Sequence, residues 1–119
     1  MKFGIVASAA ALVFAFASVA SAQDAAPAGN AQTGQKIFLS DGCWECHGSV
    51  GQGGAVTGPR LAATALPYAA FVQQLRVPQN AMPPYETTIL SDADAANIYA
   101  FLKSLPAAQA AKDIPLLNN

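Results

Sequence analysis

Runs of lysine and arginine are absent from this chain of 119 residues, which carries only 6 basic and 7 acidic side chains and has a net charge of −1. A protein that binds nucleic acid needs a basic stripe to neutralise phosphates, so this class of function is excluded. Alternating runs of β-branched residues and internal repeats are missing too, which argues against strands and repeat architectures. With this length and composition the chain forms one small domain at most.

A long apolar segment occurs once, at the N-terminus. Lys2 precedes an alanine-rich apolar run that ends in the small-residue triplet ASA at positions 20–22. This pattern is typical of a secretory signal peptide that is cleaved before Gln23. The run is also long enough to span a bilayer as an uncleaved anchor, but its alanine-rich composition and its cleavable triplet favour removal. We therefore predict a signal peptide over residues 1–22 and a periplasmic mature protein, with no stable membrane insertion after cleavage.

Proline and glycine divide the remaining chain into three parts. Residues 23–29 (QDAAPAG) have the composition of a short flexible linker. Residues 30–106 contain the patterns of an ordered domain, and residues 107–119 form a C-terminal tail to which we assign no role. A domain of this size is marginally stable without a staple or a cofactor.

Three longer helices are predicted within the ordered domain. The first covers residues 31–40 and is capped by Asn30. The second has Pro67 as its first helical residue and ends before residues 77–85, whose three prolines forbid a helix. The third begins at Ser91, with an acidic residue in the capping-box position, and ends at the following proline. The predicted fold class is therefore all-α.

One motif carries a specific chemistry. Residues 43–47 read CWECH, and this C-x-x-C-H pattern is the attachment site of c-type haem. The spacing lets the thiols of Cys43 and Cys46 reach the two vinyl groups on one side of a porphyrin and form thioethers, while His47 brings an imidazole nitrogen to the iron. The chain has no other cysteine or histidine, and predicted export agrees, because covalent haem attachment takes place outside the cytoplasm. We predict one covalently bound haem c per chain.

Other interpretations of the two cysteines are weaker. A structural zinc site needs four ligands, and two cysteines with one histidine leave it one ligand short. A disulfide between Cys43 and Cys46 would close a very short loop and stabilise little. A thioredoxin-like redox pair is typical of a βαβ setting, which this sequence lacks.

Met82 is the only methionine after the predicted signal peptide. It could be a gap-filling core residue. However, Pro83 follows it and restricts its backbone to an extended conformation, which places the thioether on a stiff loop that can cross the second face of the haem. A second histidine is absent, and a lysine would first have to lose its proton. We therefore predict His47 and Met82 as the two axial ligands, a pairing that raises the reduction potential.

Together these residues resemble the small bacterial class I c-type cytochromes. The resemblance covers residues 30–106. It rests on an ordered set of positions: Gly34 and Phe38, CWECH at 43–47, Gly58-Pro59-Arg60-Leu61, Phe71, Leu75-Arg76, Met82-Pro83-Pro84-Tyr85, Tyr99 and Leu102. It implies three to five helices wrapped around one covalently bound haem, joined by long irregular loops.

The resemblance also implies roles for residues outside the motif. The carbonyl of Pro59 would accept a hydrogen bond from His47 and orient its ring, although Pro59 could instead only shape the loop. Gly34 would let the first and last helices approach closely near Tyr99. Four side chains would line the haem pocket: Leu61, Tyr68, Phe71 and Leu75.

The predicted function is that of a one-electron carrier rather than an enzyme, with iron cycling between Fe(III) and Fe(II). Its partners would be redox proteins, and a narrower hypothesis makes the chain the electron-accepting subunit or partner of a periplasmic dehydrogenase. Too few lysines are present for docking through a lysine ring, so we expect a mainly apolar haem face. The alternative is a five-coordinate haem protein that binds a gas or reduces peroxide, which would require Met82 to be off the iron.

Overall fold

The computed structural model describes residues 25–117, so the predicted signal peptide lies outside the described residues. The ordered elements are α1 (Ala31–Ser40), α2 (Cys43–His47), α3 (Tyr68–Arg76) and α4 (Asp92–Ser104), followed by two 3₁₀ turns, η2 (Ala111–Asp113) and η3 (Pro115–Leu117). No strand occurs between residues 25 and 117. The all-α fold class predicted from the sequence is confirmed.

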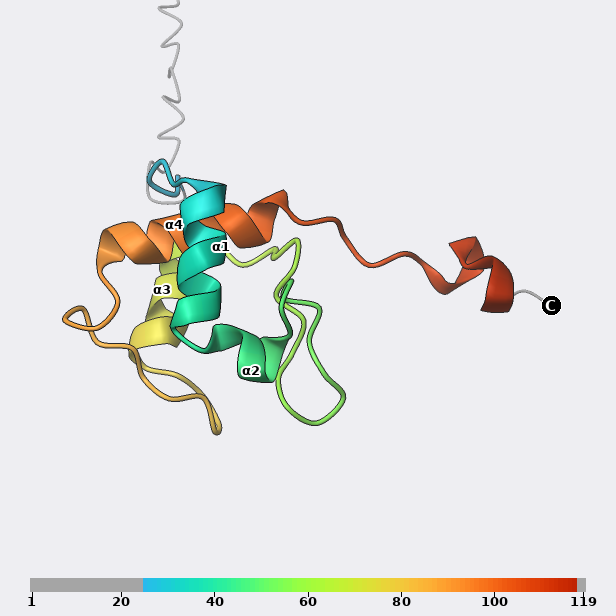
Figure 1. Cartoon of the computed structure of the whole chain (residues 1–119), viewed down its shortest axis with the longest axis horizontal. Coiled ribbons are helices and arrows are strands. Elements are labelled where there is room, and N and C mark those ends of the chain that lie inside the picture. The colour runs from blue at the N-terminus through green and yellow to red at the C-terminus, as the bar shows by residue number, and fades with distance from the viewer. Residues whose placement is uncertain (1–24, 118–119) are drawn as a thin grey trace, which may run out of the picture.

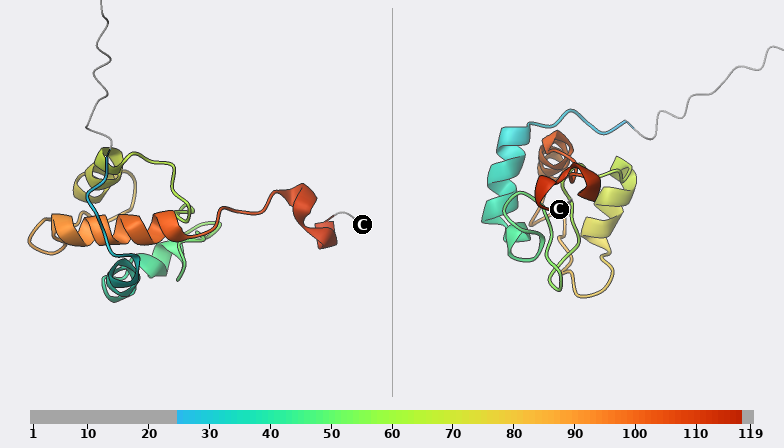
Figure 2. Two further views of the ribbon diagram at one scale, coloured as in Figure 1. Left: turned by 90° about the horizontal axis from the view of Figure 1, so that it is seen from above. Right: turned by 90° about the vertical axis from the view of Figure 1, so that its right-hand side faces the viewer.

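Helix α4 is the centre of the fold. Both views in Figure 2 show it lying between α1 and α3. Its buried side chains form most of the core, which includes Ile98, Phe101 and Leu102. The ring of Phe101 meets that of Phe38 on α1 with the centroids 5.6 Å apart. The core is small, since only Phe38, Leu90 and Leu102 are large side chains with less than 2% exposure among the described residues.

Helix α1 is capped as the sequence predicts and crosses α4 at very short range. The side chain of Asn30 accepts a hydrogen bond from the Thr33 amide at 2.8 Å, which satisfies one free donor of the first turn. The backbone N–H of Asn30 also donates to Oδ1 of Asn97 on α4 at 2.8 Å. At Gly34 an added Cβ would lie 1.9 Å from the carbonyl oxygen of Asn97, so only glycine allows this crossing.

Helix α4 begins at a reciprocal cap. The hydroxyl of Ser91 accepts from the amide of Asp94 at 3.1 Å and donates to its carboxylate at 2.7 Å. Helix α3 begins one residue later than predicted, because Pro67 is its N-cap with ψ 148 and Tyr68 is the first helical residue. A proline needs no amide partner at this position, which suits the start of a helix.

The two ends of the described chain differ in their packing. In the predicted linker, Ala26 packs against the core, and Gly29 lies so close to α4 that a Cβ would be 2.2 Å from the carbonyl oxygen of Ala96. The tail beyond α4 extends away from the helices (Figure 1), and neither η2 nor η3 buries a residue. None of the helices described is long and apolar enough to cross a membrane.

Candidate haem site

The two cysteines lie on one short helix that follows α1 almost directly. Gly42 provides the turn, with φ 77 in the left-handed region that favours glycine. Cys43 and Cys46 are three positions apart, so they share a face of α2. Both are free cysteines, Cys46 exposed and Cys43 half-buried against the core. Burial raises the pKa of the Cys43 thiol, so this group stays a neutral thiol near pH 7.

The ring of His47 is buried and has a defined orientation. The side chain is 8% exposed, and its Nδ1 lies 2.9 Å from the carbonyl oxygen of Pro59. Because a carbonyl only accepts, Nδ1 carries the proton and donates it. The lone pair is then on Nε2, which is the form of histidine that binds a metal. The contact implied by the resemblance is present, and it leaves Nε2 as the ring nitrogen that can accept a metal.

The loop after α2 encloses this histidine. The amide of Gly53 donates to the His47 carbonyl at 2.7 Å, and the Thr57 hydroxyl donates to the Cys46 carbonyl at 2.8 Å. At Gly58 a Cβ would lie 3.0 Å from Nδ1 of His47 and 2.9 Å from the Cys46 carbonyl oxygen. The absence of a side chain at Gly58 therefore gives the imidazole the space it occupies.

Met82 lies on the loop of residues 77–85, which follows α3. Figure 1 shows this loop and α2 on the same side of α4, and the right-hand view in Figure 2 agrees. The side chain of Met82 is half-buried and packs against the core. Its sulfur lies 3.7 Å from Nε2 of Gln74, a hydrogen bond in which the amide donates. The thioether is thus held within the fold and not directed into solvent.

The Met82 loop is closed by its neighbours at both ends. The Tyr85 amide donates to the carbonyl of Leu75 at 2.8 Å. The guanidinium of Arg76 donates to the carbonyls of Tyr85 at 2.6 Å and Leu90 at 2.9 Å, and it pairs with Asp92 at 2.6 Å. These bonds join the last turn of α3 to the start of α4 across the base of the loop.

Tyr85 also ties the loop to the haem-attachment helix. Its hydroxyl donates to the carbonyl of Asp41, two residues before Cys43, at 3.0 Å. Burial is the main cause that raises the pKa of this hydroxyl to about 12. The phenol therefore stays protonated, and able to donate, far into the alkaline range.

The four side chains that the resemblance places in the haem pocket differ in their burial and contacts. Phe71 and Leu75 are buried in the core, and Leu61 is half-buried against it. Tyr68 packs edge-on against Tyr99 with ring centroids 5.3 Å apart. Its hydroxyl donates to the carbonyl of Asp92 at 3.2 Å.

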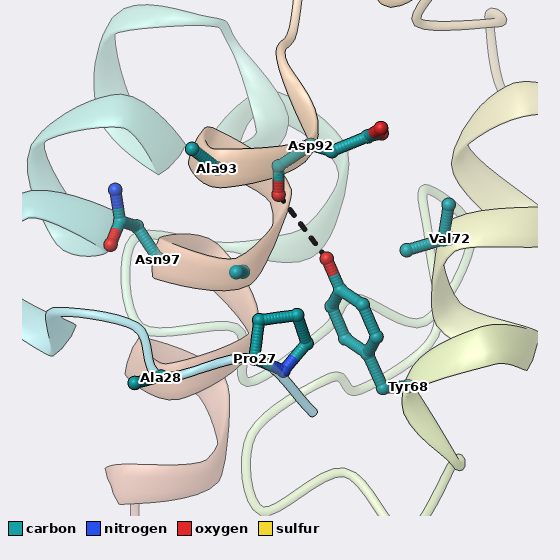
Figure 3. A pocket seen from close by; sticks show the side chains of 8 residues that line it. Pro27, Ala28, Tyr68, Val72, Asp92, Ala93 and Asn97 are labelled. Atoms are coloured by element: carbon teal, nitrogen blue, oxygen red, sulfur yellow. Dashed lines mark hydrogen bonds between the residues drawn. The ribbon is translucent and has the colours of Figure 1, made fainter. Parts of the chain in front are cut away.

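Tyr68 belongs to a hollow that contains none of the haem-motif residues. Figure 3 shows Tyr68 and Asp92 in this hollow, with Pro27 from the N-terminal segment. Its full lining is Pro27, Ala28, Tyr68, Val72, Asp92, Ala93, Ala96 and Asn97. A role for Tyr68 in lining a haem pocket therefore stays a prediction. Its ring contacts Tyr99 on α4 and Phe71 on α3.

Sequence reasoning found the motif but missed several residues that support it. Gln74 has no motif signal, because a glutamine on a helix is ordinarily a solvated polar residue. The hydroxyl bond of Tyr85 joins positions 44 residues apart, a separation that local patterns do not report. Gly58 is the one supporting residue that the sequence does point to. It directly precedes Pro59, so it belongs to the loop around His47.

Comparison with known proteins establishes the family. The family described as cytochrome c oxidase, cbb3-type, subunit III matches residues 29–102. The chain belongs to this family. Among solved structures, a chain described as c-type cytochrome NirC is 30% identical, with 63% of this chain and 93% of that chain covered and a TM-score of 0.49. No curated protein matches significantly.

Membership in the cbb3-type subunit III family confirms that the chain is a small c-type cytochrome with one covalently bound haem c. The site fits this cofactor on its own observations. Two free thiols share a helical face, and a buried imidazole has its Nδ1 engaged and its Nε2 lone pair left over. Both features are what thioether attachment and iron ligation require.

Proposed function

We propose that this cytochrome is a periplasmic one-electron carrier in which His47 and Met82 are the axial ligands of the haem iron. The observation that carries the proposal is the fixed tautomer of His47, whose Nδ1–H is bonded to Pro59 at 2.9 Å. The half-buried Met82 supports it, because its loop is closed by hydrogen bonds at both ends. Covalent attachment would be through Cys43 and Cys46.

The bound haem would supply a single-electron couple between Fe(III) and Fe(II). The chain would contribute a rigid setting for that couple. Pro59 keeps the His47 ring in one orientation, and a fixed outer partner of this kind also makes the imidazole a stronger ligand. With both axial positions filled, the site favours electron transfer over oxygen or peroxide chemistry, which needs an open position.

The predicted partners are larger redox proteins, of which a periplasmic dehydrogenase is one. The matched family is described as a subunit of a cytochrome c oxidase, which supports a small carrier that serves a larger enzyme. Large apolar side chains are exposed in and after the motif, with Trp44 and Val50 each 45% exposed and Val56 96% exposed. Glu45 is the one charged side chain of the motif itself. Because this surface offers few charges, electron transfer to the partner should depend weakly on ionic strength.

A potentiometric titration of the purified, exported protein tests this function. We expect one reversible transition with a one-electron slope and no change in the reduced spectrum when carbon monoxide is added. The transition should be retained in Val56→Ser, a control on the exposed loop. Rapid carbon monoxide binding by the wild type would instead show an open iron and a gas-binding or peroxide-reducing protein.

A further inference from the structure

The side-chain amide of Gln74 donates a hydrogen bond to the thioether sulfur of Met82, the predicted ligand. The distance of 3.7 Å lies within the range of a hydrogen bond to sulfur. We propose that Gln74 is a positioning residue for Met82, and that its N–H group sets the electron-donating strength of the sulfur. The inference rests on the proposed function, since it takes Met82 to be an axial ligand.

The surroundings of Gln74 make this contact a feature of the fold. Gln74 lies in the last turn of α3, directly before the two residues that close the Met82 loop. Leu75 accepts from the Tyr85 amide at 2.8 Å, and Arg76 donates to the Tyr85 carbonyl at 2.6 Å. The chain that carries Met82 is therefore brought back to the same helical turn that carries Gln74.

The two neighbouring glutamines of α3 differ in their burial. Gln74 is half-buried, whereas its neighbour Gln73 is exposed. Phe71 and Leu75 anchor the inner face of α3 in the core, so the helix cannot rotate to exchange the two glutamines. A half-buried amide gains more from a partner than an exposed one, since water competes less for its N–H groups.

The chemistry follows from the two lone pairs of the thioether. One pair is available to the iron, and a donor on the second withdraws electron density from the sulfur. When the sulfur donates less electron density, Fe(III) loses more stabilisation than Fe(II) does. The hydrogen bond therefore raises the reduction potential. Gln74 would thus adjust the potential without touching the haem.

The test compares Gln74→Leu with Gln73→Leu, which removes the same amide from the exposed neighbouring position. Both holoproteins are titrated alongside the wild type. For Gln74→Leu we expect a lower potential, with the ratio of reduced to oxidised protein at a fixed ambient potential falling about two- to tenfold, the range of one neutral hydrogen bond. Gln73→Leu should match the wild type. Equal potentials in all three proteins would overturn the role of Gln74.

A second measurement separates this inference from the proposed function. The oxidised wild type should show the weak far-red band of a sulfur–iron bond, and its absence would overturn both the ligation and the role of Gln74. If the band is present, NMR of the reduced wild type should show the Gln74 side-chain amide close to the Met82 methyl group. A Met82 methyl signal without that contact would overturn the role of Gln74 alone, even if Gln74→Leu does not fold.

Discussion

His47 shows how single residues determine the chemistry of the site. Its ring is fixed by one acceptor, the carbonyl of Pro59, and by the missing side chain of Gly58. The first sets which nitrogen carries the proton, and the second sets how closely the loop can approach. The motif alone points to His47 as the proposed ligand, but the orientation of its ring depends on the loop that encloses it.

Gly58→Ala should therefore alter the haem environment. The new Cβ would lie 3.0 Å from Nδ1 of His47, so the ring or the loop has to shift and the bond to Pro59 lengthens. We expect a changed reduction potential together with a loss of stability of about 1–3 kcal/mol. Potentiometry and thermal unfolding measure the two effects.

Gly42→Ala is the matched control for this substitution. A Cβ at Gly42 meets nothing closer than 3.8 Å, but its φ of 77 strains any other residue. It should lose about 1 kcal/mol of stability with an unchanged potential. Equal potentials for Gly58→Ala and Gly42→Ala would show that the space at Gly58 does not govern the His47 ring.

At the scale of elements, helix starts were predictable and long-range contacts were not. The caps at Asn30 and Ser91 form from side chains three residues from their partners, so the sequence reports them directly. Pro67 was placed one residue too far inside its helix, because a proline suits both the N-cap and the first turn. The bond between Gln74 and Met82 depends on how the loop closes, which no local pattern contains.

Tyr85→Phe tests the link between the Met82 loop and the haem-attachment helix. It removes the hydroxyl that donates to Asp41 and leaves the aromatic ring in place. We expect a loss of about 1 kcal/mol in the free energy of unfolding. Chemical denaturation of the holoproteins measures it, and an unchanged midpoint would mean that the bond contributes nothing.

The same hydroxyl predicts a pH dependence. Its pKa is raised from 10.0 to about 12 in the folded protein, so folding favours the protonated phenol. The stability it contributes is complete below pH 10, the value for an unfolded phenol, and is lost as the pH rises through about 12. Tyrosine-selective NMR titration should show a signal that titrates near pH 12 and disappears in Tyr85→Phe. A Tyr85 signal that titrates near pH 10 would contradict the prediction.

Gly34→Ala tests the crossing of α1 and α4. Its Cβ would lie 1.9 Å from the Asn97 carbonyl oxygen, so the helices must separate. Overpacking of this kind costs about 1–3 kcal/mol, which exceeds the gain in helix propensity of up to about 1 kcal/mol. The thermal midpoint should fall by several degrees, while Gln35→Ala, on an exposed position of the same helix, should leave it nearly unchanged. A midpoint of Gly34→Ala equal to that of Gln35→Ala would refute the close crossing.

At the scale of the whole molecule, the core is small, and we expect that it does not support a stable fold by itself. Three large side chains of the described residues are almost fully inaccessible to solvent, and small domains commonly depend on a cofactor or a staple. The haem would complete the core by packing against the half-buried Leu61 and Met82. Cofactor binding and folding should therefore be coupled.

The double variant Cys43→Ala with Cys46→Ala, purified free of haem, tests this coupling. We expect it to be unfolded, without a cooperative transition by circular dichroism. The wild-type holoprotein is the control and should unfold cooperatively. A cooperative thermal transition in the haem-free variant would show that the polypeptide folds alone.

The central claim is that Met82 completes the coordination of the haem iron opposite His47. The most direct measurement is the far-red absorption of the oxidised protein, compared between the wild type and Met82→Ala. We predict the weak sulfur-to-iron band in the wild type, its loss in Met82→Ala, and carbon monoxide binding only in the reduced variant. A wild type without the band that binds carbon monoxide as rapidly as Met82→Ala would contradict this claim.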